Sequence, residues 1–157
     1  IAVIASGFAA EVGQRDFVVT WPLLSRIPAL SGLNAEDVGR MIHYLKALHF
    51  DAHREVISPE DEADAMFFIV SGTVRVRTEA GETIFQTGDF FGELAMLEAR
   101  DHTHAYRTAA PTKLLRLSRA DFLFLCETHP RVTDHIAEVA KSRRQAREVG
   151  RPDNSAV

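Results

Sequence analysis

The sequence predicts an α+β fold: an antiparallel β-roll, jelly-roll-like, with N-terminal helices before it and two C-terminal helices after it. Apolar residues recur at helical spacing before residue 51 and again after residue 118. Between these regions, short apolar or alternating segments are separated by turn residues, which is typical of strands. A run of strands flanked by helices favours an α+β layout, and 157 residues suit a single domain.

The helical part before residue 51 begins with short pieces. Trp21-Pro22 and Ile27-Pro28 interrupt residues 17–30, so we expect short helical segments broken by turns there. Asn34 then suits an N-cap, with acidic residues in the turn that follows. The next apolar residues recur at helical spacing and predict one buried helix face; they are Val38, Met41, Ile42, Leu45 and Leu48.

The central part predicts a compact set of strands. Thr73–Thr78 alternates with period two, and Ser71-Gly72 before it reads as a turn. Glu79–Gly81 suits a hairpin connection. The other predicted strands are Met66–Val70, Thr83–Phe85, His104–Thr108 and Lys113–Leu117.

Helical signals return at Ser118, a capping residue three positions before Asp121. His129-Pro130 breaks this helix and starts a second one. The apolar stripe of the second helix is Val132, Ile136, Val139 and Ala140. Residues 150–157 are expected to form a disordered tail.

Composition argues against several classes of function. The net charge of −4 disfavours a general nucleic-acid binder. A single cysteine, Cys126, excludes an internal disulfide framework. The sequence contains no nucleophile–base motif, no phosphate-loop lysine and no pair of acids placed near a base. We therefore expect a protein that is not an enzyme, without a metal or cofactor.

The segment Gly88–Leu97 carries the strongest functional signal. Two glycines and two phenylalanines lead into a short helical stretch, whose free backbone N–H groups suit an anion. Glu93 would repel phosphate there unless it accepts sugar hydroxyl groups. This segment resembles the phosphate-binding cassette of the cyclic nucleotide-binding domain family. The resemblance extends over about residues 20–148 and includes Met66–Gly72, Ala120–Phe122 and Pro130.

The resemblance implies a role for individual residues toward cAMP or cGMP. The N–H groups of Gly92, Leu94 and Ala95 would face the cyclic phosphate, and Glu93 would accept the ribose 2′-hydroxyl. Thr103 matches a position that donates a hydroxyl to phosphate or base. The remaining implied contacts are Val76 as a wall for the purine, and Arg143 or Arg144 as a lid over the base.

The sequence departs from the family at the residue that pairs with the phosphate. His102 stands where the family has an arginine, beside Asp101. A histidine offers at most one donor and is half charged near pH 6.5, so the change is expected to cost on the order of 2–4 kcal/mol of binding free energy. Arg100 and Arg107 lie close enough in sequence to replace the charge. His53 and Glu60 occupy positions that are usually glycine, which predicts different turns there.

The N-terminal residues suggest a channel. Residues 1–10 are uncharged and mostly apolar, and either form an ordinary helix packed on the domain or end a membrane helix. Residues 5–17 resemble the pore-helix exit of bacterial six-helix potassium channels. We therefore expect residues 1–17 to be the tail of a pore-lining helix and 18–149 to be the nucleotide-binding domain. The implied protein is a tetrameric potassium channel, with this domain on the cytoplasmic face of the inner membrane, where it couples nucleotide binding to gating.

Other interpretations remain open. The same fold serves as the sensor of transcription regulators of the catabolite-activator type. A cassette that has lost its ligand would act in assembly or gating alone. His102 and His104, two apart on the predicted strand, would face the same side and either ligate a metal or form the polar mouth of a pocket. The acidic cluster Glu60–Asp64 is expected to be a solvated loop, because it lacks the glycine of a calcium loop.

Overall fold

The structure is a computed structural model that describes residues 24, 27, 30 and 33–149. The expected pore-helix tail at 1–17 and the expected disordered tail at 150–157 lie outside the described residues, as does most of the segment 17–30. Leu24, Ile27 and Leu30 are described and are fully buried or nearly so, at 0 to 2 % exposed. These leucine and isoleucine side chains belong to the hydrophobic core beneath the helices.

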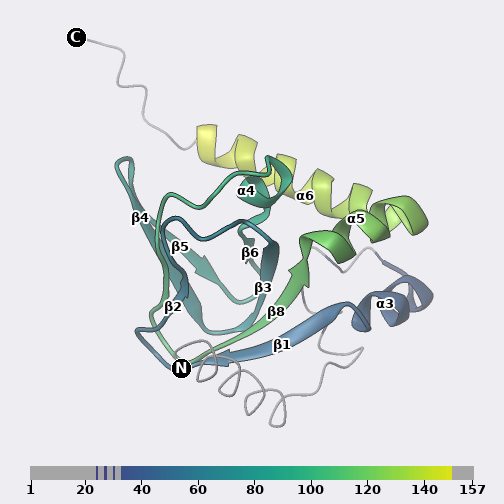
Figure 1. The fold of residues 1–157 in the computed structure, drawn as a ribbon, viewed down its shortest axis with the longest axis horizontal. Helices are drawn as coiled ribbons and strands as arrows, with labels where there is room; N and C mark the ends of the chain where they lie inside the picture. The colour runs from purple at the N-terminus through teal and green to yellow at the C-terminus, as the bar shows by residue number, and fades with distance from the viewer. Residues whose placement is uncertain (1–23, 25–26, 28–29, 31–32, 150–157) are drawn as a thin grey trace.

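The described residues form two antiparallel four-stranded sheets that enclose a β-roll, with helices gathered on one side of it (Figure 1). One sheet has the strand order β1-β8-β3-β6, and the other has the order β2-β7-β4-β5. The strands are β1 Leu45–Phe50, β2 Glu55–Ile57, β3 Ala65–Ser71, β4 Thr73–Thr78, β5 Gly81–Gln86, β6 Phe90–Phe91, β7 Tyr106–Thr108 and β8 Thr112–Ser118. The helices are α3 Ala35–Ile42, α4 Glu93–Leu97, α5 Arg119–Thr128 and α6 Pro130–Val149. This arrangement confirms the predicted fold class.

Two hydrophobic cores share strand β3. Met66 and Phe68 belong to the core under the helices, while Phe67 and Ile69 belong to the core inside the roll. Because successive side chains of a strand point to opposite faces, a strand buried on both faces needs an unbroken apolar run. The sequence Ala-Met-Phe-Phe-Ile-Val of β3 meets that requirement.

Strand β1 corrects the prediction of a helix face reaching Leu48. Helix α3 ends at Ile42, and Leu45 opens a strand that pairs with β8 from Leu45↔Leu117 to Phe50↔Thr112. Leu45 and Leu48 are buried, as expected, but in a sheet rather than a helix. Six ladder positions on β8 outweigh the weak helical preference of this segment, because tertiary pairing overrides local propensity.

The predicted helix caps are confirmed. Asn34 Oδ1 accepts a hydrogen bond from the N–H of Asp37 at 2.8 Å, and Ser118 Oγ accepts one from the N–H of Asp121 at 3.1 Å. Val132 and Ile136 of α6 are buried, and Val139 and Ala140 pack against the same core. The predicted apolar stripe of α6 is therefore the face that covers the roll.

Several turns have left-handed backbone, among them those at Gly72, His53 and Glu60. Gly72, with φ of +105°, joins β3 to β4, and a Cβ there would lie 2.4 Å from Thr112 Oγ1. His53 and Glu60 have φ values of +62° and +72°, the region that glycine favours. At both turns a residue with a Cβ therefore adopts the backbone conformation that glycine favours, at a cost in strain. That these turns differ from those of the family stays a prediction.

No helix among the described residues combines the length and the apolar character needed to cross a bilayer.

Candidate functional site

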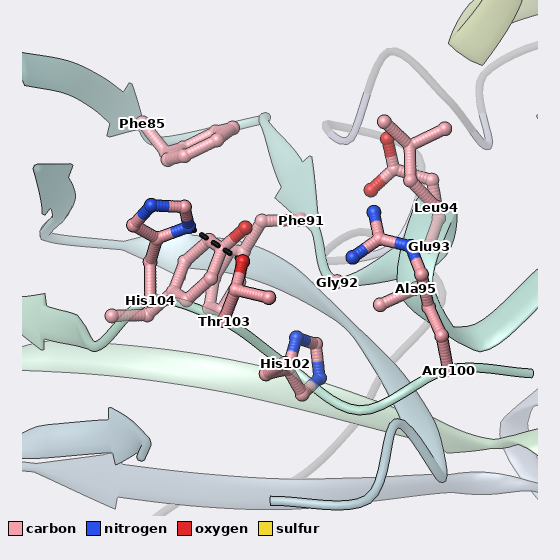
Figure 2. A pocket seen from close by; sticks show the side chains of 11 residues that line it. Phe85, Phe91, Gly92, Glu93, Leu94, Ala95, Arg100, His102, Thr103 and His104 are labelled. Atoms are coloured by element: carbon pink, nitrogen blue, oxygen red, sulfur yellow. Dashed lines mark hydrogen bonds between the residues drawn. The ribbon is translucent and has the colours of Figure 1, made fainter. Parts of the chain in front are cut away.

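A pocket of about 190 Å³ opens between α4, the end of β5 and the segment before β7 (Figure 2). It brings together six of the residues predicted from the sequence, which are Gly92, Glu93, Leu94, Ala95, His102 and Thr103. The other five lining residues are Phe85, Phe91, Arg100, His104 and Tyr106. Arg100 was a candidate to replace the phosphate charge and His104 a candidate for the polar mouth of a pocket, whereas the three aromatic residues were not singled out from the sequence as ligand contacts. The start of α4 and the segment before β7 therefore line one pocket.

Gly92 positions the start of α4. It has a left-handed φ of +85° and caps the helix, and a Cβ at this position would lie 3.2 Å from the carbonyl oxygen of Ala65. Helix α4 begins at Glu93, so the N–H groups of its first turn have no acceptor within the helix. These N–H groups and the positive end of the helix suit an anion in the pocket.

Aromatic side chains form one wall of the pocket. The rings of Phe91 and Tyr106 are stacked with centroids 5.2 Å apart, and the ring of Phe85 lies 5.6 Å from that of Phe91. Phe85 and Phe91 are buried, so this wall is continuous with the core inside the roll. Phe85 could have been found from the sequence, because it occupies an inward position in the alternation of β5. Phe91 could not, because β6 has only two residues and therefore shows no period.

His102 is held firmly in the wall of the pocket. Its side chain is buried, at 6 % exposed, and its N–H donates to the carbonyl oxygen of Asp61 at 2.9 Å. Burial lowers the pKa of His102 below the usual 6.5, and the charge of Arg100 lowers it further, against the opposing effect of Asp61, Asp64 and Asp101. The imidazole is therefore neutral at pH 7 and supplies no permanent positive charge.

Arg100 brings a positive charge to the same pocket. Its side chain lines the pocket together with Glu93 and Leu94 (Figure 2), and its Nε donates to Glu98 Oε2 at 2.5 Å. Both partners are about half exposed, with 47 % for Arg100 and 56 % for Glu98. Arg107, in contrast, lies on the outer face of the roll and donates to Glu55 at 2.7 Å. Of these two arginines, Arg100 is the one in the pocket.

His102 and His104 do not form the strand pair that was expected. Strand β7 begins at Tyr106, so both histidines lie in the irregular segment before it. His104 Nδ1 shares a hydrogen bond of 2.8 Å with Thr103 Oγ1. Within the described part of the chain, no group of three or more histidine, cysteine or acidic side chains is arranged to hold a metal. The two histidines are polar residues of the pocket.

Of the remaining predicted residues, only Val76 has a described side chain. Val76 is buried at 5 % exposed in the core inside the roll, which also contains Phe85 and Phe91, and is not among the residues that line the pocket. Arg143 and Arg144 belong to the C-terminal half of α6, but their side chains lie outside the described part of the structure.

Comparison with known proteins agrees with this geometry. The family model of the cyclic nucleotide-binding domain matches residues 47–129, which include the whole pocket. A cyclic nucleotide-gated potassium channel of Mesorhizobium japonicum is 31 % identical over 92 % of the chain, and one of Rhizobium etli is 30 % identical over 90 %. The chain spans 40 % of the length of each channel.

Solved structures share the fold. The catabolite activator protein of Thermus thermophilus superposes with a TM-score of 0.67 at 24 % identity, over 78 % of this chain and 60 % of that one. The regulatory subunit of a cAMP-independent protein kinase A from Trypanosoma brucei superposes with a TM-score of 0.66 at 21 % identity, over 96 % of this chain and 51 % of that one. With the family match and the channel relatives, the conclusion is that this chain belongs to the cyclic nucleotide-binding domain family.

Proposed function

We propose that the chain is the regulatory domain of a cyclic nucleotide-gated potassium channel. In this proposal it binds cAMP or cGMP and couples binding to a transmembrane pore of the same polypeptide, in a tetramer with the domain on the cytoplasmic face of the inner membrane. The main support is the pocket, which joins a helix start, an acid, an arginine and an aromatic wall within the residues that the family model matches. The channel relatives also align over 90 % or more of the chain.

The proposed ligand pose follows from the chemistry of the lining. The cyclic phosphate lies at the start of α4, where it accepts hydrogen bonds from the N–H groups of Gly92, Leu94 and Ala95. Glu93 accepts a hydrogen bond from the ribose 2′-hydroxyl. Thr103 donates its hydroxyl to the phosphate or the base after exchanging its present partner His104. The base packs against the aromatic wall backed by Val76, with Arg143 or Arg144 of α6 covering it.

Arg100 is the proposed partner of the phosphate charge in place of His102. The support is its position in the pocket and the nature of its present bond: an ion pair between two half-exposed groups is worth about 0–1 kcal/mol, so exchange of Glu98 for a phosphate costs little. An arginine also gives phosphate a planar, permanently charged donor set. Neutral His102 then contributes at most one hydrogen bond.

The experiment is isothermal titration of the domain with cAMP and with cGMP at pH 7.5 and pH 6. We expect binding by the wild type, and a loss of at least tenfold in affinity for Arg100→Gln. Arg107→Gln is the matched control, because Arg107 lies outside the pocket, and it should bind within twofold of wild type. No binding by the wild type at millimolar nucleotide would contradict the proposed function; binding that survives Arg100→Gln would contradict only the role of Arg100.

A second candidate function is a domain that has lost its ligand and acts in assembly or gating alone. The observation that favours it is the buried, neutral His102 at the position of the phosphate partner, with Arg100 paired to Glu98. The same titration separates the two candidates. A transcription regulator of the catabolite-activator type has weaker support, because the catabolite activator protein superposes on 78 % of the chain, whereas the channel of Mesorhizobium japonicum aligns over 92 %.

A further inference from the structure

Three arginines form a positively charged hollow on the outer face of the roll, separate from the pocket described above. Val74 and Val76 of β4 point into the core, so the alternation of the strand places Arg75 and Arg77 outward. Arg107 of β7 lies beside them. The hollow has a volume of about 400 Å³, and its lining is His53, Arg75, Arg77, Glu82, Ala105, Arg107 and Thr108.

The register of the sheet sets two of these arginines directly against each other. Arg75 is the cross-strand partner of Arg107 in the antiparallel pair of β4 and β7. Like charges that face each other directly across a sheet destabilise it. In a chain of net charge −4, this juxtaposition concentrates positive charge on one part of the surface.

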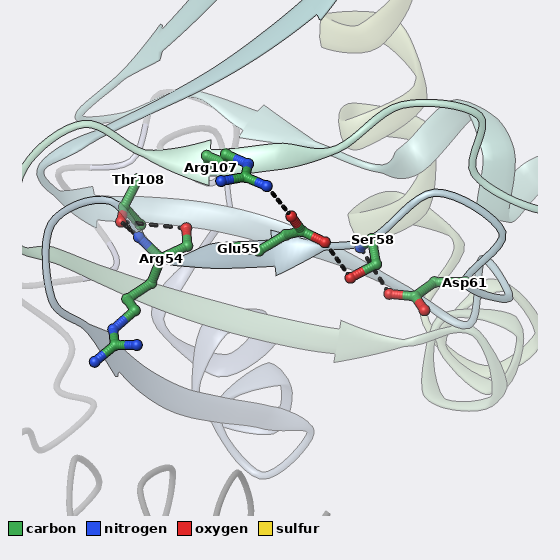
Figure 3. Close-up of polar contacts among 6 residues, drawn as sticks. All are labelled: Arg54, Glu55, Ser58, Asp61, Arg107 and Thr108. Carbon is green, nitrogen blue, oxygen red and sulfur yellow. Dashed lines mark hydrogen bonds and ion pairs between the residues drawn. The ribbon is translucent and has the colours of Figure 1, made fainter. Parts of the chain in front are cut away.

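The neighbouring acids offset only part of that charge. Glu82 Oε1 lies 3.8 Å from both Arg75 Nη1 and Arg77 Nη2, which is beyond hydrogen-bond distance. Glu55 accepts a hydrogen bond from Arg107 at 2.7 Å (Figure 3). The three arginine side chains are 44 %, 83 % and 60 % exposed, so their guanidinium groups are accessible from solvent.

We propose that this hollow binds a doubly charged phosphate group, either in a free phosphate compound or in a phosphomonoester lipid headgroup. Guanidinium groups bind phosphate oxygens through paired, charge-assisted hydrogen bonds, and a dianion placed between Arg75 and Arg107 turns their repulsion into a shared attraction. A cyclic phosphate carries a single charge and gains less from such a site. The proposal is therefore independent of nucleotide binding in the inner pocket.

The test uses pyrophosphate as the soluble probe, titrated at low ionic strength and followed by calorimetry. We expect binding by the wild type and a loss of at least tenfold for Arg75→Gln and for Arg107→Gln. Arg54→Gln is the matched control, because Arg54 is exposed nearby but its guanidinium points away from Arg107 (Figure 3), and it should stay within twofold. An equal loss in Arg54→Gln would show non-specific attraction and overturn the proposal, as would no binding by the wild type.

Two further measurements locate the site and its source of phosphate. Saturating cAMP should leave pyrophosphate affinity unchanged; displacement would place the anion in the inner pocket and overturn the proposal. Vesicles of phosphatidylcholine with phosphatidic acid distinguish a lipid from a free compound. Co-sedimentation that Arg75→Gln abolishes identifies the lipid headgroup, and pyrophosphate binding without co-sedimentation identifies a free phosphate. The stability of the unliganded variant tests the repulsion between the arginines. Arg75→Gln should unfold at the wild-type temperature or above it, since a repulsion is removed, whereas a lower temperature would assign Arg75 a structural role.

Discussion

Glu60 donates its backbone N–H to the carbonyl oxygen of His102 at 2.7 Å while its own backbone is left-handed. The N–H of His102 in turn donates to the carbonyl oxygen of Asp61. These two bonds tie the acidic loop to the segment that carries the pocket histidine. The left-handed turn at Glu60 therefore helps to hold His102 in the pocket wall.

Replacing Glu60 with glycine should stabilise the domain. A non-glycine residue in the left-handed region costs about 1–2 kcal/mol of stability. Glycine removes this cost, but it also increases the entropy of the unfolded chain, which offsets part of the gain in stability. We expect Glu60→Gly to raise the free energy of unfolding by about 0.5–1 kcal/mol, measured by urea denaturation. Glu60→Ala is the control, since it removes the same carboxylate but keeps the strain. Equal gains in both variants would show that charge rather than backbone strain is responsible.

The stability of the domain should fall as pH drops below about 6.5, in part because of His102. Burial lowers the pKa of His102 in the folded state, so the unfolded chain binds a proton more readily. The contribution of His102 to the free energy of unfolding is fully present above the unfolded pKa of about 6.5 and is lost as pH falls toward the folded pKa. The loss is at most about 1.4 kcal/mol per pH unit. The measurement is urea unfolding at pH 7.5, 6.5 and 5.5. The difference between wild type and His102→Gln should shrink with falling pH, and a constant difference would contradict this assignment.

His102→Arg should tighten cAMP binding by at least tenfold at pH 7.5. The neutral imidazole offers the phosphate at most one hydrogen bond, whereas a guanidinium offers a charged pair of donors. Titration calorimetry measures the change. His49→Arg adds the same charge at an exposed position of β1 and should leave affinity unchanged. An unaltered affinity in His102→Arg would show that the position does not reach the phosphate.

Gly72→Ala should destabilise the domain by several kcal/mol. A Cβ at this position would lie 2.4 Å from Thr112 Oγ1 and 2.6 Å from the carbonyl oxygen of Pro111, on a backbone with φ of +105°. Gly39→Ala is the contrasting control, because no atom lies within 4 Å of its added Cβ and the position is helical. We expect Gly39→Ala to gain about 0.5–1 kcal/mol by thermal or urea unfolding. Similar effects at the two glycines would refute the packing argument.

Phe91→Leu should destabilise the domain and weaken nucleotide binding. Phe91 stacks on both Phe67 and Tyr106, with ring centroids 5.3 Å and 5.2 Å apart, and it lines the pocket. Aromatic pairs contribute about 0.5–1.5 kcal/mol each beyond the buried area, so we expect a loss of about 1–3 kcal/mol of unfolding free energy, measured by urea denaturation. Phe90→Leu is the control for binding, because Phe90 packs in the core under the helices, and it should leave nucleotide affinity unchanged.

The sequence predicted those elements whose signals are local. The caps at Asn34 and Ser118 and the unbroken apolar strand β3 needed no knowledge of distant residues. The strand at Leu45 was missed because its ladder partner lies about 70 residues later in β8, and the apolar spacing of the segment also fits a helix. Strand β6, with two residues, is too short to show a period.

The backbone of the candidate site could be predicted from the sequence, whereas the positions of its charged groups could not. The cassette from Gly92 to Ala95 follows from consecutive residues, so its position in the pocket could be anticipated. Arg100 and Arg107 are equivalent in sequence, and only the fold places one at the pocket and the other beside Glu55. The burial that keeps His102 neutral likewise arises from the loop at Glu60 and Asp61, about 40 residues away.

The two phenylalanines of β6 face different cores: Phe90 packs under the helices, and Phe91 packs inside the roll at the pocket. Because they are neighbours on one strand, a displacement of β6 moves side chains in both cores together. The interior of the roll and the helical layer therefore cannot be remodelled independently. Mutations that adapt the pocket to another ligand through β6 will alter helix packing as well, which narrows the routes by which this domain can change specificity.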